Sequence, residues 1–321
     1  MSLVFGFLVL VSHGPDPSTG TKSVPHPGKS ATVMAVNSEQ SMMLLAAGVP
    51  QAWNLATADP KTGVVKKKLN QVKFPRDAEI RTMVPLQGGG YLIAPTFGFA
   101  VLDKDLSVSN RIEVGYLNRA AVNKDQTLLA WTSFSRNPET VIYDLKKKTV
   151  KWRIQDNDIV GEILFLRDDL LLTAGFNGVF LMDTKTEKKK QISKRGPHTI
   201  AFHPPSNLVA LGESFGQLTL LNLQTFLEIS LKGHDADITA LAFSPDGTFL
   251  VSATRAPPFV DNELRVWDVT NKAMMKRAKQ GAESRFVLFL DDGKRFTTGQ
   301  LDKAGNVELY LLADFTNALP K

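Results

Sequence analysis

One pattern of short apolar segments separated by turn residues recurs along the chain, and it constrains the fold more than any other feature. Its clearest copy contains Ile238–Phe243, Thr248–Thr254 and Leu264–Asp268. The turn Ser244-Pro245-Asp246-Gly247 joins the first two, because Pro presets a turn φ and Gly accepts a positive φ. Short apolar and β-branched segments bounded by such turns predict antiparallel strands, with Ala273–Ala278 as a fourth, outermost strand.

Six weaker copies show the same order of three apolar segments. They are Thr32–Val36, Met42–Ala46 and Gln51–Leu55; Thr82–Leu86, Tyr91–Ala94 and Phe99–Asp103; Arg119–Val122, Leu128–Ser133 and Thr140–Leu145; Glu162–Leu166, Leu170–Ala174 and Val179–Asp183; His198–Phe202, Leu208–Gly212 and Gln217–Leu223; and Arg285–Leu290, Arg295–Thr298 and Asn306–Leu312. The 294 residues from Gly28 onward divide into seven units of 42, and four-stranded propeller blades repeat at about 40–45 residues. We therefore predict an all-β fold, a single seven-bladed β-propeller of four-stranded antiparallel blades.

The residue types argue against catalysis. The chain has no cysteine, which excludes disulfides, zinc–thiolate sites and cysteine nucleophiles. His198 and His203 are five residues apart, so a regular strand cannot direct both into one site. No metal-ligand, nucleophile or phosphate-loop motif is present. We predict no catalytic residue, metal site or cofactor; the alternative is a propeller enzyme or small-molecule binder whose ligands converge on the central channel.

The clearest copy resembles the WD-repeat (WD40) β-propeller family at Gly233-His234, at its Ser-Pro-Asp-Gly turn and at Trp267-Asp268. The other six copies are degenerate at these positions. The resemblance implies a structural tetrad of His234, Ser252, Asp261 and Trp267, with Asp261 six residues before Trp267. In it the carboxylate orients the imidazole, and the Ser hydroxyl links the imidazole to the indole N–H. Such a buried network is stabilising only when every member is satisfied.

The resemblance also implies that an N-terminal strand closes the ring. Thr21–Pro25 is the candidate partner of Asn306–Leu312, so residues 21–321 form the propeller and residues 1–20 an apolar N-terminal segment. Leu3–Val11 has the length of a signal-peptide core but lacks a preceding Lys or Arg. It predicts an exported or periplasmic protein if it is a signal core, and a cytoplasmic protein if it is a buried strand or an apolar tail.

Lysine runs follow the third strand in three copies. They are Lys66, Lys67 and Lys68; Lys146, Lys147 and Lys148; and Lys188, Lys189 and Lys190. Lysines on an edge strand hinder pairing with other sheets, which is the first interpretation. The alternative, in a chain of net charge +6, is a basic rim that binds nucleic acid or an anionic membrane. No aromatic residues interleave with the lysines, which argues against stacked single strands.

Two loops between second and third strands are long, Ser135–Glu139 and Arg255–Val260. Both are expected on one face of the ring, and loops on a rigid scaffold often carry binding. We predict Arg255, Phe259 and Arg136 as partner-binding residues, although Phe259 packed against its own blade is the alternative. The predicted function is a non-catalytic, monomeric scaffold for protein–protein interaction, with another protein bound to this face.

Overall fold

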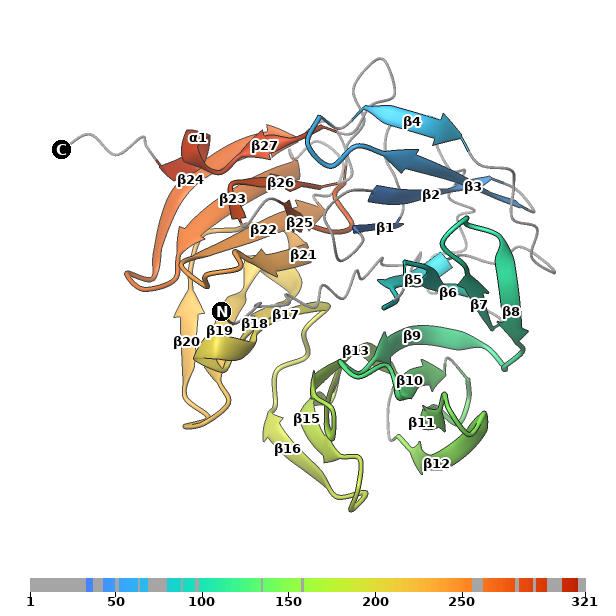
Figure 1. Cartoon of the computed structure of the whole chain (residues 1–321). Helices are drawn as coiled ribbons and strands as arrows, with labels where there is room; N and C mark the ends of the chain where they lie inside the picture. Colours follow the sequence, from blue (N-terminus) through green and yellow to red (C-terminus); the bar gives the residue numbers. More distant parts are fainter. Residues whose placement is uncertain are drawn as a thin grey trace.

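A computed structural model of the chain describes residues 33–36, 43–49, 52–62, 64–68, 80–87, 89–95, 98–133, 135–156, 159–255, 262–280, 283–290, 293–298 and 308–316. Apart from short helical turns, the regular structure in these ranges is antiparallel β-sheet. The sheets are arranged in chain order around a centre, with the first strand of each sheet innermost (Figure 1). The fold is therefore a β-propeller.

Six sheets contain four strands each, and we call them blades one to six. The strands are β1 (Val33–Val36), β2 (Met43–Val49), β3 (Ala52–Ala58) and β4 (Val65–Lys68) in blade one; β5 (Ile80–Pro85), β6 (Tyr91–Pro95), β7 (Phe99–Leu102) and β8 (Val108–Ile112) in blade two; β9 (Leu117–Val122), β10 (Leu128–Ser133), β11 (Glu139–Asp144) and β12 (Thr149–Gln155) in blade three; β13 (Val160–Arg167), β14 (Leu170–Gly175), β15 (Gly178–Asp183) and β16 (Lys189–Ser193) in blade four; β17 (Thr199–His203), β18 (Leu208–Gly212), β19 (Leu218–Asn222) and β20 (Glu228–Leu231) in blade five; and β21 (Asp237–Phe243), β22 (Phe249–Arg255), β23 (Asn262–Asp268) and β24 (Ala273–Gln280) in blade six.

The last sheet corrects the predicted blade count. It has three strands, β25 (Leu288–Leu290), β26 (Arg295–Thr297) and β27 (Tyr310–Leu311), and α1 (Ala313–Thr316) follows β27. The prediction of seven four-stranded blades is wrong, because the described residues form six such blades. Equal division of the chain could not show that the segment after β27 turns into a helix instead of extending the sheet.

The packing of α1 explains this ending. Phe315 is buried, with its ring 5.5 Å from Phe296 and 6.3 Å from Tyr310. Lys276 of β24 donates a hydrogen bond to the Asp314 carbonyl at 2.7 Å. The helix is therefore held between the three-stranded sheet and blade six. The expected closing strand, Thr21–Pro25, lies outside the described residues.

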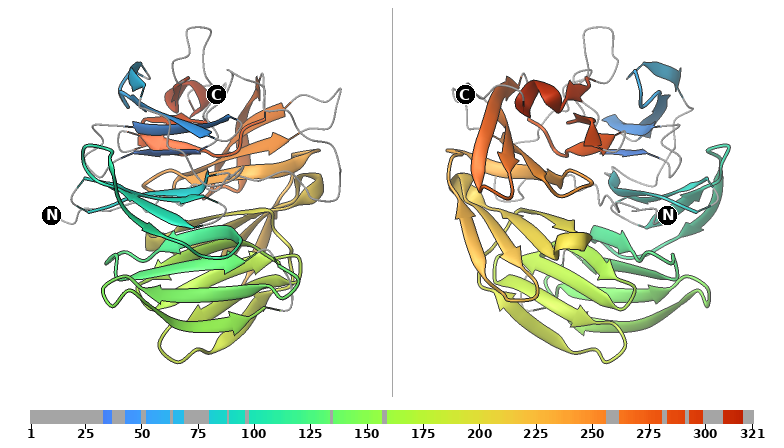
Figure 2. Two further views of the ribbon diagram at one scale, coloured as in Figure 1. Left: turned by 90° about the vertical axis from the view of Figure 1, so that its right-hand side faces the viewer. Right: turned by 60° about the vertical axis from the view of Figure 1, so that its left-hand side comes forward.

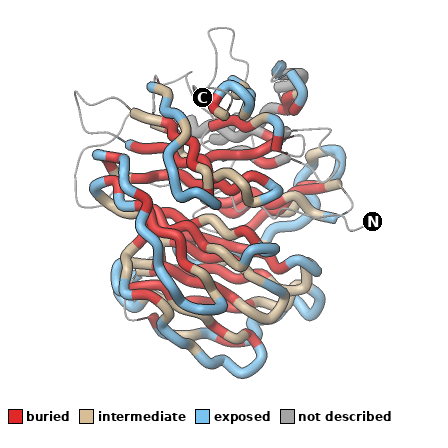
Figure 3. The backbone as a smooth tube through the Cα atoms, turned by 90° about the vertical axis from the view of Figure 1, so that its left-hand side faces the viewer, coloured by how far each residue is buried: buried red, intermediate tan, exposed pale blue. Residues whose placement is uncertain are grey.

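The hydrophobic core lies between neighbouring blades. On β22, Leu250 packs toward blade five together with Trp267, whereas Val251 and Ala253 pack toward the last sheet and Phe289. Both faces of the inner strands are thus covered, which is why these segments are apolar almost without interruption. Buried strands with exposed connecting turns are visible in Figure 3.

The turns from third to fourth strand share one geometry. In blades two to six the last or following residue of the third strand accepts backbone N–H bonds through its side chain; these residues are Asp103, Asp144, Asp183, Asn222 and Asp268. The backbone N–H bonds hold the pKa of the Asp144, Asp183 and Asp268 carboxyls below their usual range. The degenerate copies therefore keep the turn-forming half of the Trp-Asp pair.

The predicted Ser-Pro-Asp-Gly turn is confirmed in blade six. Gly247 donates its N–H to the Ser244 carbonyl at 2.8 Å and has a φ of +73°. A Cβ at this position would lie 2.3 Å from Cε1 of His203. Gly247 is therefore required both by the turn and by the close approach of blade five.

Antiparallel strands give the ring two distinct faces. Loops between second and third strands open on one face, which we call the top face, and turns between third and fourth strands lie on the opposite, bottom face. The side views in Figure 2 show connections at both ends of the strands. His198 precedes β17 and His203 ends it, so the two histidines lie toward opposite faces.

Candidate functional site

Three members of the predicted tetrad lie together inside blade six. Nε2 of His234 is 2.6 Å from Oγ of Ser252, which accepts a hydrogen bond from the Trp267 indole N–H at 2.8 Å. All three side chains are buried, and Trp267 belongs to the core between blades five and six. Asp261 lies outside the described residues, so its part in the tetrad stays a prediction.

The environment of His234 favours a neutral imidazole. Burial, and to a lesser extent the charge of the nearby Arg265 guanidinium, lower the pKa of the imidazole to about 3. Its Nδ1 has no hydrogen-bond partner among the described residues. The group is enclosed between blades and holds structure together; it offers no surface to a partner.

The top face presents two exposed phenylalanines in equivalent loops of adjacent blades. Phe176 lies between β14 and β15 and has 69% of its surface exposed; Phe215 lies between β18 and β19 and has 84% exposed. Phe215 also has a φ of +56°, a conformation that bulky residues rarely adopt. These exposed apolar side chains in adjacent blades make the top face the candidate contact surface.

Contacts join these two residues into one surface. The rings of Phe176 and His198 are 6.1 Å apart in an edge-on arrangement. Nε2 of His198 is 2.6 Å from Oγ of Ser214, the residue before Phe215. His198 therefore fixes the spacing between the loops of blades four and five.

The same surface extends to blade six. The Phe215 N–H donates to Oδ1 of Asp237 at 3.1 Å, and Oδ2 of Asp237 is 3.7 Å from a guanidinium nitrogen of Arg255. We define the top-face site as Phe176, His198, Phe215, Asp237 and Arg255. Arg255 was predicted from the sequence, and it is exposed at the end of β22.

The other predicted partner-binding residues are placed differently. Arg136 is exposed in the β10–β11 loop of blade three and takes no part in the contacts that define the top-face site. Phe259 lies outside the described residues. The sequence analysis missed Phe176 and Phe215, although one signal was available: a phenylalanine also stands between the second and third strands at Phe97, Phe134 and Phe259.

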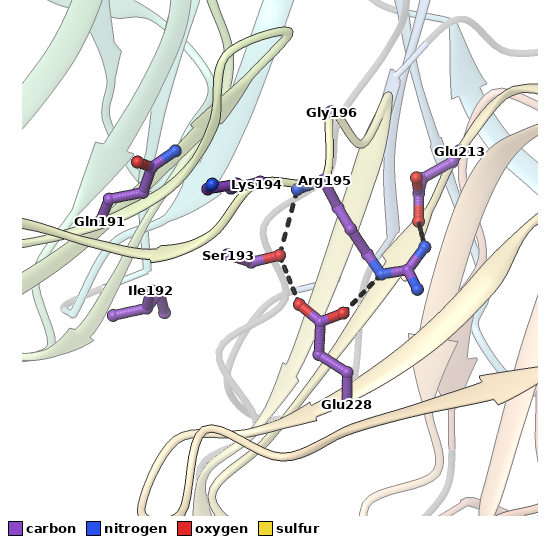
Figure 4. Close-up of a pocket in the computed structure, with 8 residues that line it drawn as sticks. All are labelled: Gln191, Ile192, Ser193, Lys194, Arg195, Gly196, Glu213 and Glu228. Carbon is purple, nitrogen blue, oxygen red and sulfur yellow. Dashed lines mark hydrogen bonds and ion pairs between the residues drawn. The ribbon is translucent and has the colours of Figure 1, made fainter.

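A hollow of about 720 Å³ lies beside this site, between blades four and five (Figure 4). Its polar lining is largely engaged internally. Arg195 donates to Glu228 at 2.7 Å and to Glu213 at 3.1 Å, and Ser193 donates to Glu228 at 2.5 Å. Figure 4 shows these side chains pointing toward one another. These hydrogen bonds and ion pairs hold blades four and five together.

The pKa shifts of Glu228 and Arg195 agree with this pairing between the blades. Burial alone would raise the pKa of Glu228, but the hydrogen bonds from Ser193 and Arg195 hold this pKa below its usual range. The same carboxylates raise the pKa of Arg195 against its own desolvation. Arg195 and Glu228 therefore stay ionised and paired at neutral pH.

The predicted basic rim divides into two kinds of lysine. Lys189 is an internal contact, with its Nζ 2.6 Å from buried Asp156 and 4.6 Å from the Phe180 ring. In contrast, Lys188 and Lys190 are exposed, as are the turn residues Lys146, Lys147 and Lys148. Lys66, Lys67 and Lys68 lie in β4, and their side chains are outside the described part.

The innermost strands contain a buried charged pair. Nε of Arg119 on β9 is 3.9 Å from Oε1 of Glu162 on β13, and neither side chain is more than 6% exposed. Burial raises the pKa of Glu162 to about 8, although the Arg119 charge lowers it.

No group of three potential metal ligands is found within the described ranges. No helix in the described part is long and apolar enough to cross a membrane.

Comparisons with known proteins agree with this architecture. The family model "WD domain, G-beta repeat" matches residues 226–268, from the outer strand of blade five to β23. A coronin-like protein of Saccharomyces cerevisiae is 27% identical over 114 residues, which are 34% of this chain and 17% of the yeast protein. The similarity thus spans less than a fifth of that relative. Together with the antiparallel propeller blades, these matches support a WD-repeat family for this chain.

Proposed function

We propose that this chain is a non-catalytic scaffold that binds another protein through the top-face site of blades four to six. The observation that carries the proposal is the exposure of Phe176 and Phe215 in equivalent loops. Aromatic residues and arginine are enriched among the few interface residues that contribute most of the binding free energy. The site offers two aromatic rings, with Arg255 at its edge.

The site is also preorganised. His198 bridges the two loops, and Asp237 ties the Phe215 backbone to blade six. A partner therefore meets side chains whose positions are already fixed, which lowers the entropy lost on binding. The mixed charges of Asp237 and Arg255 at its margin favour a polar rim around an apolar centre.

Affinity capture from native lysate, followed by titration calorimetry with the identified partner, tests the proposal. The test variant combines Phe176→Ser with Phe215→Asn, since Asn tolerates the positive φ. The matched control is Phe226→Asn, which has the same residue type and a φ of +58° in a bottom-face turn of the same blade. We expect the test variant to weaken binding at least about thirtyfold and the control to bind as wild type. Equal binding by both variants would refute the top-face site.

A further inference from the structure

The bottom-face turn of blade five differs from its equivalents in the other blades. The residue with positive φ in these turns is Leu106, Lys148, Glu187, Phe226 or Lys272. In blade five alone among these five turns, two large apolar residues stand together: Phe226 is 38% exposed and Leu227 66%. Ile229 on the adjoining strand β20 is 37% exposed.

The fold itself gives no reason for this choice. A bulky residue at positive φ is disfavoured. Three of the four equivalent turns form with lysine or glutamate at the same position, and the fourth has Leu106, which is followed by a serine and not by a second large apolar residue. An exposed Leu227 adds nothing to the core between blades. The apolar turn tip is therefore best explained by a contact outside the chain.

Positive charge surrounds this tip. Nζ of Lys190, on the outer strand of blade four, lies 4.5 Å from the centre of the Phe226 ring. Lys188 and Lys190 are exposed, and the turn of blade three on the same face adds Lys146, Lys147 and Lys148. We define the bottom-face patch as Phe226, Leu227, Ile229, Lys188 and Lys190.

The acidic groups near the patch do not cancel this charge. Glu228 is engaged by Arg195 and Ser193, and Asp183 accepts the backbone N–H groups of its own turn. Glu187 is exposed beside Lys188. Five exposed lysines at the turns of blades three and four (Lys146, Lys147, Lys148, Lys188 and Lys190) outnumber the three carboxylates of these two turns, Asp144, Asp183 and Glu187.

We propose that the bottom-face patch binds the surface of an anionic lipid bilayer. Phe226 and Leu227 enter the interface between headgroups and acyl chains, while Lys188 and Lys190 pair with lipid phosphates. A protruding apolar tip with flexible point charges fits a fluid surface, which rearranges around it.

Vesicle co-sedimentation of the full chain tests this proposal. The probes are vesicles of phosphatidylcholine alone and of phosphatidylcholine with phosphatidylserine, at low and high salt. We expect binding only to the anionic vesicles, weakening as salt rises.

Two variants should each reduce that binding. Phe226→Asn with Leu227→Ser removes the apolar tip and should weaken partitioning at least about tenfold. Lys188→Glu with Lys190→Glu reverses the charges and should weaken it at least about twentyfold. Phe215→Asn, the matched change on the top face, should leave vesicle binding unchanged. Equal melting midpoints will show that all variants are folded.

Three results would overturn the proposal. They are absence of binding to anionic vesicles at low salt, wild-type binding by the Phe226/Leu227 variant, and capture of an acidic protein in place of vesicles by the patch. None of these bears on the top-face site, because that site is tested by its own variants.

Discussion

The interface between blades five and six and the interface between blades three and four solve the burial of polar groups in opposite ways. The first uses a neutral hydrogen-bonded chain, in which Ser252 links His234 to Trp267. The second buries Arg119 beside Glu162, and neither carboxylate oxygen has a hydrogen-bond partner among the described residues. Among the described residues the first arrangement leaves only Nδ1 of the neutral His234 without a partner, whereas the second leaves both oxygens of a carboxylate without one, and such a carboxylate is costly to ionise. The comparison teaches that the clearest repeat, that of blade six, stabilises its interface with blade five. The interface between the degenerate repeats of blades three and four instead contains a carboxyl group that is costly to ionise.

Trp267→Ala should give the largest effect. The side chain is 1% exposed in the core between blades five and six, so its removal leaves a cavity as well as an unpaired Ser252. We expect a loss of about 3–5 kcal/mol in the free energy of unfolding, measured by urea denaturation. A loss below about 1 kcal/mol would show that this interface is not a main support.

Glu162→Gln should change how stability depends on pH. The folded pKa of Glu162 is raised from 4.5 to about 8, so its contribution is fully present below pH 4.5 and is lost as pH rises through 8. Gln does not titrate, so the variant should gain roughly 4 kcal/mol relative to wild type between pH 5 and pH 9. A variant that is less stable by the same amount at every pH would show that the Arg119 pair stabilises the fold.

His234→Ala should destabilise the chain by about 1–3 kcal/mol, because it removes the imidazole that is hydrogen-bonded to the buried Ser252 hydroxyl. A double-mutant cycle with Ser252→Ala measures the coupling, which should be well above the additivity error for independent sites. Additive effects would remove the hydrogen-bonded chain from this explanation.

Phe215→Asn should have the smallest effect and supplies the baseline for both interfaces. The side chain is 84% exposed, and Asn tolerates its positive φ. Thermal and urea unfolding should change by less than about 0.5 kcal/mol. A larger loss would mean that Phe215 packs against its own blade in solution.

Local features could be predicted from the sequence, and contacts between distant segments could not. The turn at Gly247 and the strands β21 to β24 follow from residues close in the chain. His234, Ser252 and Trp267 fall within one repeat, so a single pattern indicates all three. Arg119 and Glu162 stand in different blades, and no local spacing relates them.

The last sheet and the exposed loop phenylalanines likewise depend on contacts that the sequence pattern does not reveal. A regular period predicted a complete last blade, but tertiary packing of Phe315 decides how the sheet ends. Apolar patterning identifies strand phenylalanines such as Phe243 as core. It cannot tell whether a loop phenylalanine such as Phe176 folds back or stays exposed.

Hydrogen exchange of the wild-type chain, free and bound to its captured partner, tests the central claim most directly. We predict new protection confined to the top-face segments 175–178, 212–218 and 235–238, with no change in the bottom-face turns. Protection limited to the bottom face or the outer strands would contradict the assignment of the binding surface to the top-face site.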